Sequence, residues 1–401
     1  MRYNTGMKIN LKNYSRLHFS HNIRSLYFST ILRQIGAGLI SLFGVIFFFE
    51  KFGNSLENVI KLFIIVFLLY GFLVPLSARL IGRIGMKKMM IVGMPFLTLT
   101  ILSLFFWDAN PILFLSLYLV FVTLFRILFW LPYHVDFAEF TETGKRGKQM
   151  AVLINISQVV LGITPLIGGF IISSYGFSTL FFIAAVIVTT AIIPLFFIED
   201  VKEKFSFGYL ETFRNLFRKN NRSLLVAHAS NGIQGAIGVI IWPIFIFAIL
   251  KGDFFVVGVI SSLTIFFILI LRTFVGSLID RWGKKRILKI GSLLSVTGWI
   301  LKIFVNSGFQ IFLADTYHNF GRVVNTLPFD VSFYDQAAEN KHYIDEYTVI
   351  RTIALNFGRV VVLLISLPII MYFGITATFI IAAIATLFMN AISRKNAPIT
   401  K

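Results

Sequence analysis

Polar side chains on one face of an otherwise apolar segment are the clearest candidates for chemistry in this sequence. In the segment 309–333 they are Asp315, His318, Asn319, Arg322 and Asn325. Residues at these spacings share one face of a helix, so the pattern predicts a polar stripe along a water-filled cavity. A carboxylate beside an imidazole can exchange a proton, whereas amides and guanidiniums can bind a polar solute.

The carboxylate of Asp315 is the candidate for proton coupling, assisted by His318 one helical turn away. Asp315 is the acidic residue that we place in the middle of an apolar segment. A proton can neutralise a charge that burial makes costly, and for this reason we expect a coupling role. The alternative is a permanent ion pair with an arginine of the cavity.

Other amides and cations in apolar segments are expected to bind the substrate in the same cavity. The candidates are Arg33, Gln34, Arg126, Gln158, Asn231, Gln234, Asn319, Arg322, Asn356 and Arg359. The alternative for any one of them is an interhelical hydrogen bond or a buried ion pair. Lys302 lies near the outer end of its segment, and we expect its ammonium group to reach the membrane interface.

The elements that must position these residues are membrane-spanning helices. Of the 401 residues, 57% are hydrophobic and 14% charged, and the mean hydropathy is +0.83. Soluble globular chains carry about 25% charged residues, and one spanning helix needs about 20 apolar residues. We therefore predict an all-α membrane protein. Its twelve expected spans lie near 26–49, 58–80, 88–107, 111–137, 149–173, 177–198, 223–250, 255–279, 286–306, 309–333, 346–372 and 375–393.

The distribution of cations predicts how the chain crosses the membrane. With an inside N-terminus, most of the 37 Lys and Arg residues fall in expected cytoplasmic segments, and the outside loops hold only Lys51 and Lys251. Cytoplasmic loops of membrane proteins carry such an excess of cations. We expect a monomer that crosses the cell (plasma or inner) membrane many times, with both termini in the cytoplasm. The net charge of +19 then reflects orientation in the lipid bilayer rather than nucleic-acid binding.

An internal repeat divides the chain into two halves of the same topology. The matching blocks are 78–88 with 276–286, 126–137 with 322–333, and 176–185 with 374–383. Parallel repeats of this kind predict a substrate site between the halves. The expected divisions are a cytoplasmic tail 1–25, a six-helix bundle 26–198, a cytoplasmic linker 199–222, a second six-helix bundle 223–393 and a tail 394–401.

The repeat also pairs two arginines. Arg126 and Arg322 occupy equivalent positions in the expected spans four and ten. Two guanidiniums that converge on one space can capture a carboxylate or a phosphate, so we expect them to form a clamp. The alternative is that each arginine is held within its own half, against Asp136, Asp330 or backbone carbonyls.

The linker contains one readable pattern. Apolar residues recur at helical spacing, with cations on the other faces, which predicts an amphipathic helix at the cytoplasmic interface. The apolar residues are Tyr209, Leu210, Phe213, Leu216 and Phe217, and the cations are Arg214, Arg218 and Lys219. The alternative is a connecting helix without a regulatory role.

Two motifs carry a family resemblance. The stretch Gly276-x-x-x-Asp280-Arg281-x-Gly283-Lys284-Lys285 resembles the signature loop of the major facilitator superfamily, between spans eight and nine. The equivalent loop of the first half keeps Arg83, Gly85, Lys87 and Lys88 but has Ala78 and Gly82 at two signature positions. Pro165-x-x-Gly168-Gly169 resembles the glycine-rich motif of span five in that family.

The resemblance implies a fold of twelve helices in two pseudo-symmetric six-helix bundles that alternate access to a central site. It also implies that spans three, six, nine and twelve are peripheral. In the family the signature loop latches the two halves, so the resemblance gives that role to Arg83, Gly85, Gly276, Asp280, Arg281 and Gly283.

These observations favour a transporter over an enzyme. The sequence has no cysteine, no phosphate-binding Gly-rich loop and no His-Glu-x-x-His spacing beside His134, Asp136 and Glu139, so we expect no catalytic residue, metal or cofactor. We expect a secondary transporter of a small solute, leaning to an organic anion, with H+ as the coupling ion. The alternatives are an exporter of amphiphilic compounds or a lipid flippase, and a non-transporting membrane sensor or assembly factor.

Overall fold

The protein is helical throughout the part of the chain that the structure describes. The computed structural model describes residues 21–133, 146–200, 208–339 and 344–393, and no strand occurs in these ranges. The candidate acids at positions 136 and 139 and the histidine at position 134 lie outside the described residues.

The N-terminal part folds into long helices joined by short turns. They are α1 (His21–Ser41), α2 (Phe43–Lys51), α3 (Leu56–Ile84), α4 (Met86–Phe105), α5 (Pro111–Phe125) and α7 (Arg146–Thr190), with a π-helical turn at Arg126–Trp130 and 3-10 segments at Trp107–Ala109 and Ile193–Phe197. Side-chain caps start two of them. Ser55 accepts a hydrogen bond from the Asn58 N–H before α3, and Asn110 accepts one from the Leu113 N–H before α5. Such caps satisfy N–H groups that no helical carbonyl reaches.

The C-terminal part begins with a short helix and continues in the same style. Its helices are α8 (Tyr209–Leu216), α9 (Arg222–Ala236), α10 (Trp242–Ile249), α11 (Phe254–Trp282), α12 (Lys284–Leu301), α13 (Gly308–Glu339), α14 (Ile344–Phe373) and α15 (Ala377–Phe388). A π-helical turn at Ile237–Ile241 joins α9 to α10. Short 3-10 segments lie at Lys219–Asn221, Lys302–Phe304 and Met389–Ser393.

Four glycines make equivalent sharp turns in the two halves. Gly85 (φ +91°) separates α3 from α4, and its repeat partner Gly283 (φ +78°) separates α11 from α12. Gly176 (φ +81°) reverses the chain inside α7, and its partner Gly374 (φ +81°) lies between α14 and α15. Glycine alone adopts these angles without strain, so the repeat extends to the backbone turns.

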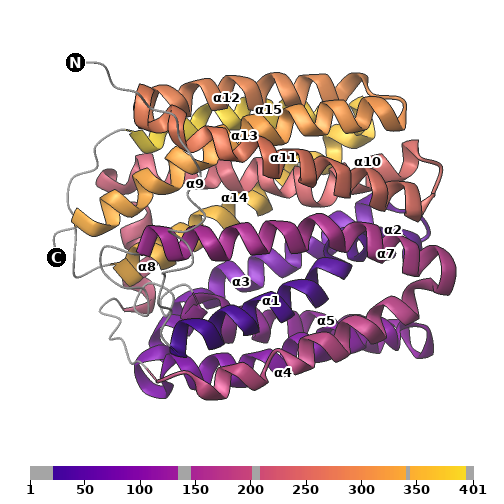
Figure 1. Cartoon of the computed structure of the whole chain (residues 1–401), viewed down its shortest axis with the longest axis horizontal. Coiled ribbons are helices and arrows are strands. Elements are labelled where there is room, and N and C mark those ends of the chain that lie inside the picture. Colours follow the sequence, from indigo (N-terminus) through magenta and orange to yellow (C-terminus); the bar gives the residue numbers. More distant parts are fainter. Residues whose placement is uncertain (1–20, 134–145, 201–207, 340–343, 394–401) are drawn as a thin grey trace, which may run out of the picture.

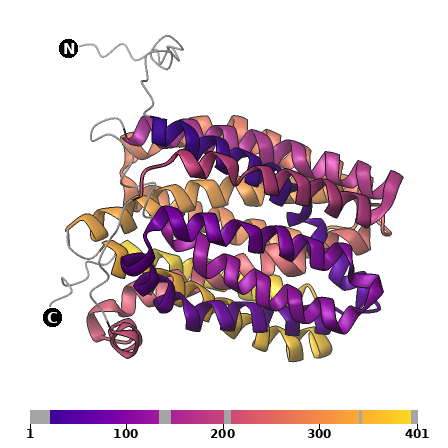
Figure 2. The same ribbon diagram turned by 90° about the horizontal axis from the view of Figure 1, so that it is seen from below.

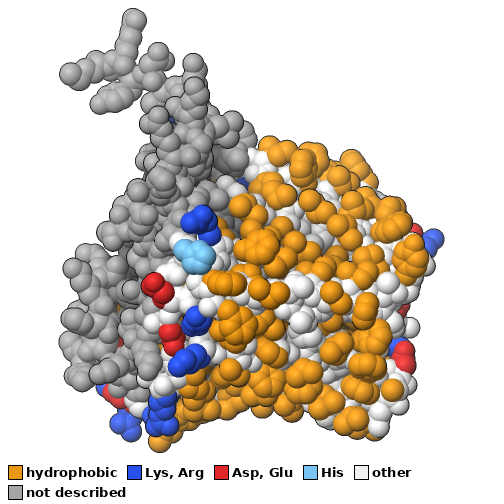
Figure 3. Space-filling model, turned by 60° about the horizontal axis from the view of Figure 1, so that its bottom comes forward, with side chains coloured by type: hydrophobic (Ala, Val, Ile, Leu, Met, Phe, Trp, Pro, Cys, Tyr) orange, Lys and Arg blue, Asp and Glu red, His pale blue; other side chains and the backbone are white. Residues whose placement is uncertain are grey.

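The long helices have the length and composition of membrane spans. Within the described ranges, nine helices are long and apolar enough to cross a membrane, and one of them, Asn155–Phe197, contains the reversal at Gly176. The face in Figure 3 is covered by hydrophobic side chains, and charged side chains gather toward its two ends. The chain is therefore an all-helical, multi-pass membrane protein.

The helices lie side by side, with the C-terminal helices stacked on the N-terminal ones in Figure 1. Within the N-terminal part α7 packs on α1 and α4, and within the C-terminal part α12 packs on α13 and α15. The parts meet most extensively at two pairs of helices, α7 with α11 and α3 with α14; α2 also packs on α10, and α3 on α8. The second view shows the same parallel arrangement (Figure 2).

The two parts approach most closely where side chains are small. A Cβ at Gly258 of α11 would collide with the carbonyl of Pro165 in α7, and one at Gly169 would collide with the carbonyl of Phe254. The Leu166 N–H also donates to Ser262 Oγ across this crossing, at 2.9 Å. Small residues allow helix backbones to approach in this way in membrane proteins.

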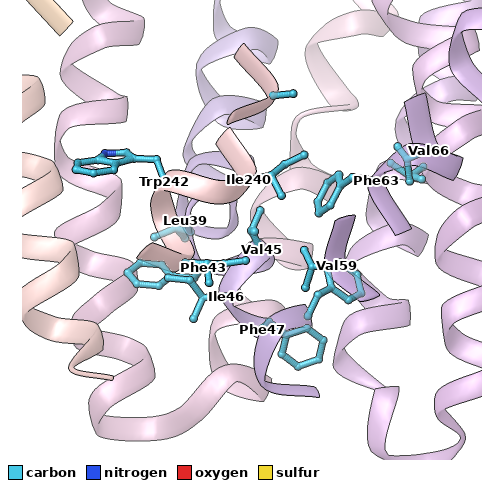
Figure 4. Packing of buried hydrophobic residues seen from close by; sticks show 14 of the residues in the cluster. Leu39, Phe43, Val45, Ile46, Phe47, Val59, Phe63, Val66, Ile240 and Trp242 are labelled. Atoms are coloured by element: carbon cyan, nitrogen blue, oxygen red, sulfur yellow. The ribbon is translucent and has the colours of Figure 1, made fainter. Parts of the chain in front are cut away.

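Aromatic and aliphatic side chains form a continuous core beside this crossing. In Figure 4, Phe43 and Ile46 from the start of the chain lie near Ile240 and Trp242 from the C-terminal part. Phe43 also contacts the ring of Phe254, with ring centroids 6.3 Å apart. The core therefore spans both parts at one end of the bundle.

Candidate functional site

Two arginines from opposite halves of the chain contact the same aromatic ring. The guanidinium carbon of Arg126 lies 5.4 Å from the ring centroid of Phe67 in α3, and that of Arg359 in α14 lies 4.8 Å from it. Arg126 also lies 5.7 Å from the ring of Tyr70. The π-helical turn that begins at Arg126 is a feature that often occurs at functional sites.

The positive charge of this pair is not neutralised within the described part of the chain. No carboxylate there forms an ion pair with Arg126 or Arg359. The two guanidiniums are near enough to repel each other. Arg359 interacts with the Tyr70 hydroxyl, and its Nη1 donates a hydrogen bond to Asn356 Oδ1 at 3.4 Å. Guanidiniums recognise carboxylates and phosphates through two hydrogen bonds each, so an anion fits between them.

Lys302 and Asp315 form a buried ion pair between α12 and α13. Lys302 Nζ lies 2.7 Å from Asp315 Oδ1, and the Lys302 residue is only 1% exposed. The ammonium also faces the rings of Trp242 and Trp299, at 4.1 and 4.7 Å from their centroids. The expectation that Lys302 reaches the membrane interface is therefore wrong, because a carboxylate and two indoles replace its water.

His318 occupies the next level of the same helix contact. Its ring centroid lies 4.4 Å from that of Trp299, and the residue is 3% exposed. Neither ring nitrogen has a hydrogen-bond partner in the part of the chain that the structure describes. A side chain at Gly298 would collide with the His318 backbone, so the glycine is what lets α12 and α13 approach here.

The polar stripe of α13 divides between two surroundings. Asp315, His318 and Asn325 turn toward α12, where Asn325 Nδ2 donates to Ser292 Oγ at 2.6 Å. Arg322 is exposed, and Asn319 is half-buried and donates to the Asp315 carbonyl of its own helix at 2.9 Å. The residues of this stripe share one helical face, but those on one edge of the face pack against α12, whereas Arg322 on the other edge is exposed.

Arg322 lies among acids of its own half. It interacts electrostatically with Asp315 and Asp330, and Asp330 itself pairs with Arg351 Nη2 at 3.1 Å and interacts with Arg272. The structure thus brings Arg126 together with Arg359, whereas Arg322 belongs to an ionic network of α11, α13 and α14. The spacing of the repeat does not indicate whether Arg126 lies near Arg322 or near Arg359.

Arg33 lies in an aromatic box of the N-terminal part. Its guanidinium carbon is 5.0, 4.9 and 5.5 Å from the ring centroids of Phe129, Trp130 and Tyr133, and the residue is buried. Its neighbour Gln34 is half-buried, and its Oε1 has no hydrogen-bond partner among the described residues. Arg33 is therefore positioned by the aromatic rings of span four.

The remaining amide candidates have different neighbours. Gln234 Nε2 donates to Met389 Sδ at 2.8 Å and its Oε1 accepts from Thr386 Oγ1 at 3.3 Å, so this side chain faces α15 and the segment after it. Asn231 accepts from Gln234 at 3.4 Å and is half-buried, as is Gln158. Asn356 is buried beside Arg359.

The candidate latch residues lie at the two equivalent glycine turns. Arg83 and Arg281 are exposed beside Gly85 and Gly283, whereas for Gly276 and Asp280 the structure describes the helical backbone alone. At the first turn a carboxylate comes from elsewhere in the chain. Asp200 Oδ1 accepts from the Lys87 N–H at 3.2 Å, next to Gly85.

Sequence reasoning missed four of these groups. Phe67 and Tyr70 look like ordinary lipid-facing or core residues, Lys302 looks like an interfacial cation, and Asp200 lies outside every repeated block. Only the position of Lys302, thirteen residues before Asp315 across a short turn, carries a signal that an antiparallel pair could form.

Comparisons with known proteins identify the family and the fold. The family model of the Major Facilitator Superfamily matches residues 26–230. No curated protein sequence matches the chain. Among solved structures, a POT family transporter in complex with 5-aminolevulinic acid is similar, with a TM-score of 0.71 and 13% identity over 92% of this chain and 95% of that chain. At this identity the likeness concerns the fold.

Proposed function

This chain belongs to the major facilitator superfamily, whose members are transporters rather than enzymes, and we propose that it carries a small organic anion across the membrane by alternating access. The observation that carries the proposal is the pair of guanidiniums at Phe67. Arg126 and Arg359 come from opposite halves, share one ring and have no carboxylate partner among the described residues. An anion between them would offset their repulsion and would connect the two halves.

The topology that we propose has twelve spans in two bundles, 26–198 and 223–393, joined by the linker 199–222. Supporting it, the nine apolar helices include one with a reversal at Gly176, and α13 and the helical stretch Ala377–Ile392 supply two further segments. We propose cytoplasmic termini, on the distribution of cations, and a monomer in the cell membrane.

The coupling group in this proposal is Asp315, with H+ as the coupling ion. Protonation of the carboxylate would remove the negative charge that pairs with Lys302. The ammonium would keep the two indoles as partners but would lose its counter-ion. Loss of a buried ion pair at the contact between α12 and α13 can change the relative populations of two conformations.

The ligand of the solved relative is of the same chemical class. That transporter was crystallised with 5-aminolevulinic acid, a small molecule with a carboxylate. A carboxylate is the group that paired guanidiniums recognise best, together with phosphate. We therefore propose small carboxylates as the first compounds to test and phosphorylated solutes as the second.

The experiment is uptake by proteoliposomes from a panel of carboxylates, phosphates, amines and neutral sugars, with and without an inward proton gradient. The double variant Arg126→Lys/Arg359→Lys keeps both charges but loses the forked geometry, so it should lose most anion uptake while remaining folded. Arg286→Lys, an exposed cation on α12, is the matched control.

Three results would contradict the proposal. A preference for amines or neutral solutes would contradict the proposal that the substrate is an anion. Full uptake by the double lysine variant would contradict a role of the arginine pair in binding it. Displacement of lipids or dyes without solute uptake would favour a flippase or an exporter of amphiphilic compounds.

A further inference from the structure

The short helix α8 lies across α3 and α14, which belong to opposite halves of the chain. It packs on both of them, at one end of the bundle (Figure 1). Leu216 is buried in one cluster with Val74 of α3 and Ile350 of α14. Tyr209 Oη donates to the Phe72 carbonyl of α3 at 2.9 Å. The helix is thus attached to both halves by its own side chains.

Two exposed apolar side chains, Leu210 of α8 and Phe217 directly after it, share one side of this segment with Arg214, and we call them its apolar face. Leu210 is 78% exposed and Phe217 is 56% exposed. Phe217 lies against Phe357 of α14, with ring centroids 6.4 Å apart, and Phe72 of α3 is exposed as well. Because Phe72 and Phe357 belong to membrane spans, the apolar face of α8 meets the same acyl chains that they meet.

The same segment carries two exposed cations, Arg214 within α8 and Lys219 three residues after its end. Arg214 and Lys219 are exposed, and no carboxylate in the described ranges forms an ion pair with either. The acid of α8, Glu211, is directed elsewhere, because its Oε2 accepts from the Gly208 N–H at 3.0 Å at the start of the helix. An apolar surface edged by unpaired cations fits the headgroup and chains of an anionic phospholipid.

We propose that α8 is a binding site for anionic phospholipids, with the headgroup phosphate on Arg214 and Lys219 and the acyl chains on Leu210 and Phe217. The apolar half of this surface selects a lipid over a free phosphate ion. Because α8 is docked on α3 and α14 together, a lipid bound here ties the two halves at this end of the bundle. Lipid binding is independent of the proposed function, and only its effect on uptake rests on the movement of the halves.

The test measures binding of fluorescent phosphatidylglycerol to the purified full-length protein in detergent. The variant Arg214→Glu/Lys219→Glu should bind it at least about thirtyfold more weakly, because the loss of each cation near an anionic headgroup costs about 1 kcal/mol and each Glu adds repulsion. The control Lys285→Glu/Lys289→Glu makes the same charge change at exposed positions of α12 and should retain wild-type affinity. Phosphatidylcholine should bind wild type and variant equally.

Several outcomes would overturn the proposal. They are wild-type affinity in the α8 variant, equal losses in both double variants, and displacement of the lipid by inorganic phosphate, which would indicate a simple anion site. In proteoliposomes, uptake should depend on phosphatidylglycerol content for the wild type and not for the α8 variant. Failure of the anion-transport proposal would leave the binding result unchanged, so the two failures are distinguishable.

Discussion

Replacing Asp315 by Leu should leave the Lys302 ammonium without its counter-ion in a site that excludes water. Lys302 is 1% exposed, and its Nζ lies 2.7 Å from the Asp315 carboxylate. Removing one partner of a buried ion pair costs about 3–5 kcal/mol. The two indoles near Nζ can recover up to about 2 kcal/mol of this. We therefore expect the variant to lose about 1–5 kcal/mol of unfolding free energy.

The double variant Lys302→Met/Asp315→Leu should be more stable than either single variant. It replaces the pair with apolar side chains of similar volume, and such replacements are often neutral or stabilising by about 1–4 kcal/mol. The measurement is the free energy of unfolding from SDS titration in mixed micelles, followed by helical circular dichroism, for wild type and three variants. The coupling energy of this cycle isolates the interaction between the two residues.

A matched control uses an exposed pair of the same type. On α3, Lys61 Nζ lies 2.6 Å from Glu57 Oε1, and both side chains are more than half exposed. Glu57→Gln should change the unfolding free energy by less than about 0.5 kcal/mol. The reasoning would be refuted if Asp315→Leu cost no more than Glu57→Gln. It would also be refuted if the double variant were no more stable than Asp315→Leu.

Three further outcomes are expected. Asp315→Asn should abolish accumulation driven by a proton gradient and leave counterflow exchange intact, and undiminished accumulation would remove this carboxylate from coupling. Spin labels on Arg83→Cys and Arg286→Cys, in a chain without native cysteine, should give two distance populations whose ratio shifts with substrate, whereas one fixed distance would contradict alternating access. Gly258→Ala should lower the unfolding free energy by about 1–3 kcal/mol because the new Cβ would collide with a carbonyl of α7. The control Gly235→Ala adds a Cβ with no atom within contact distance and should be neutral or slightly stabilising, so equal effects of the two variants would contradict the tight crossing.

The membrane class and the positions of the turns could be predicted from the sequence alone, because both depend on local energies. Apolar segments of sufficient length partition into a bilayer whatever their neighbours are. Glycine is needed wherever the backbone takes a positive φ, so Gly85 with Gly283, and Gly176 with Gly374, appear as repeat positions and as equivalent turns. The family resemblance, drawn from the signature loops and the repeat, is confirmed by the family match over residues 26–230.

The surroundings of the candidate site were decided by the tertiary structure. Helical spacing predicts which residues of α13 share a face. That face is wide enough for His318 to pack against α12 while Arg322 is exposed. The expected clamp of Arg126 with Arg322 and the paired contact of Arg126 with Arg359 are equally compatible with the sequence. Which guanidinium lies over Phe67 depends on how α3 and α14 cross, and this depends on side-chain packing between segments that are hundreds of residues apart in the chain.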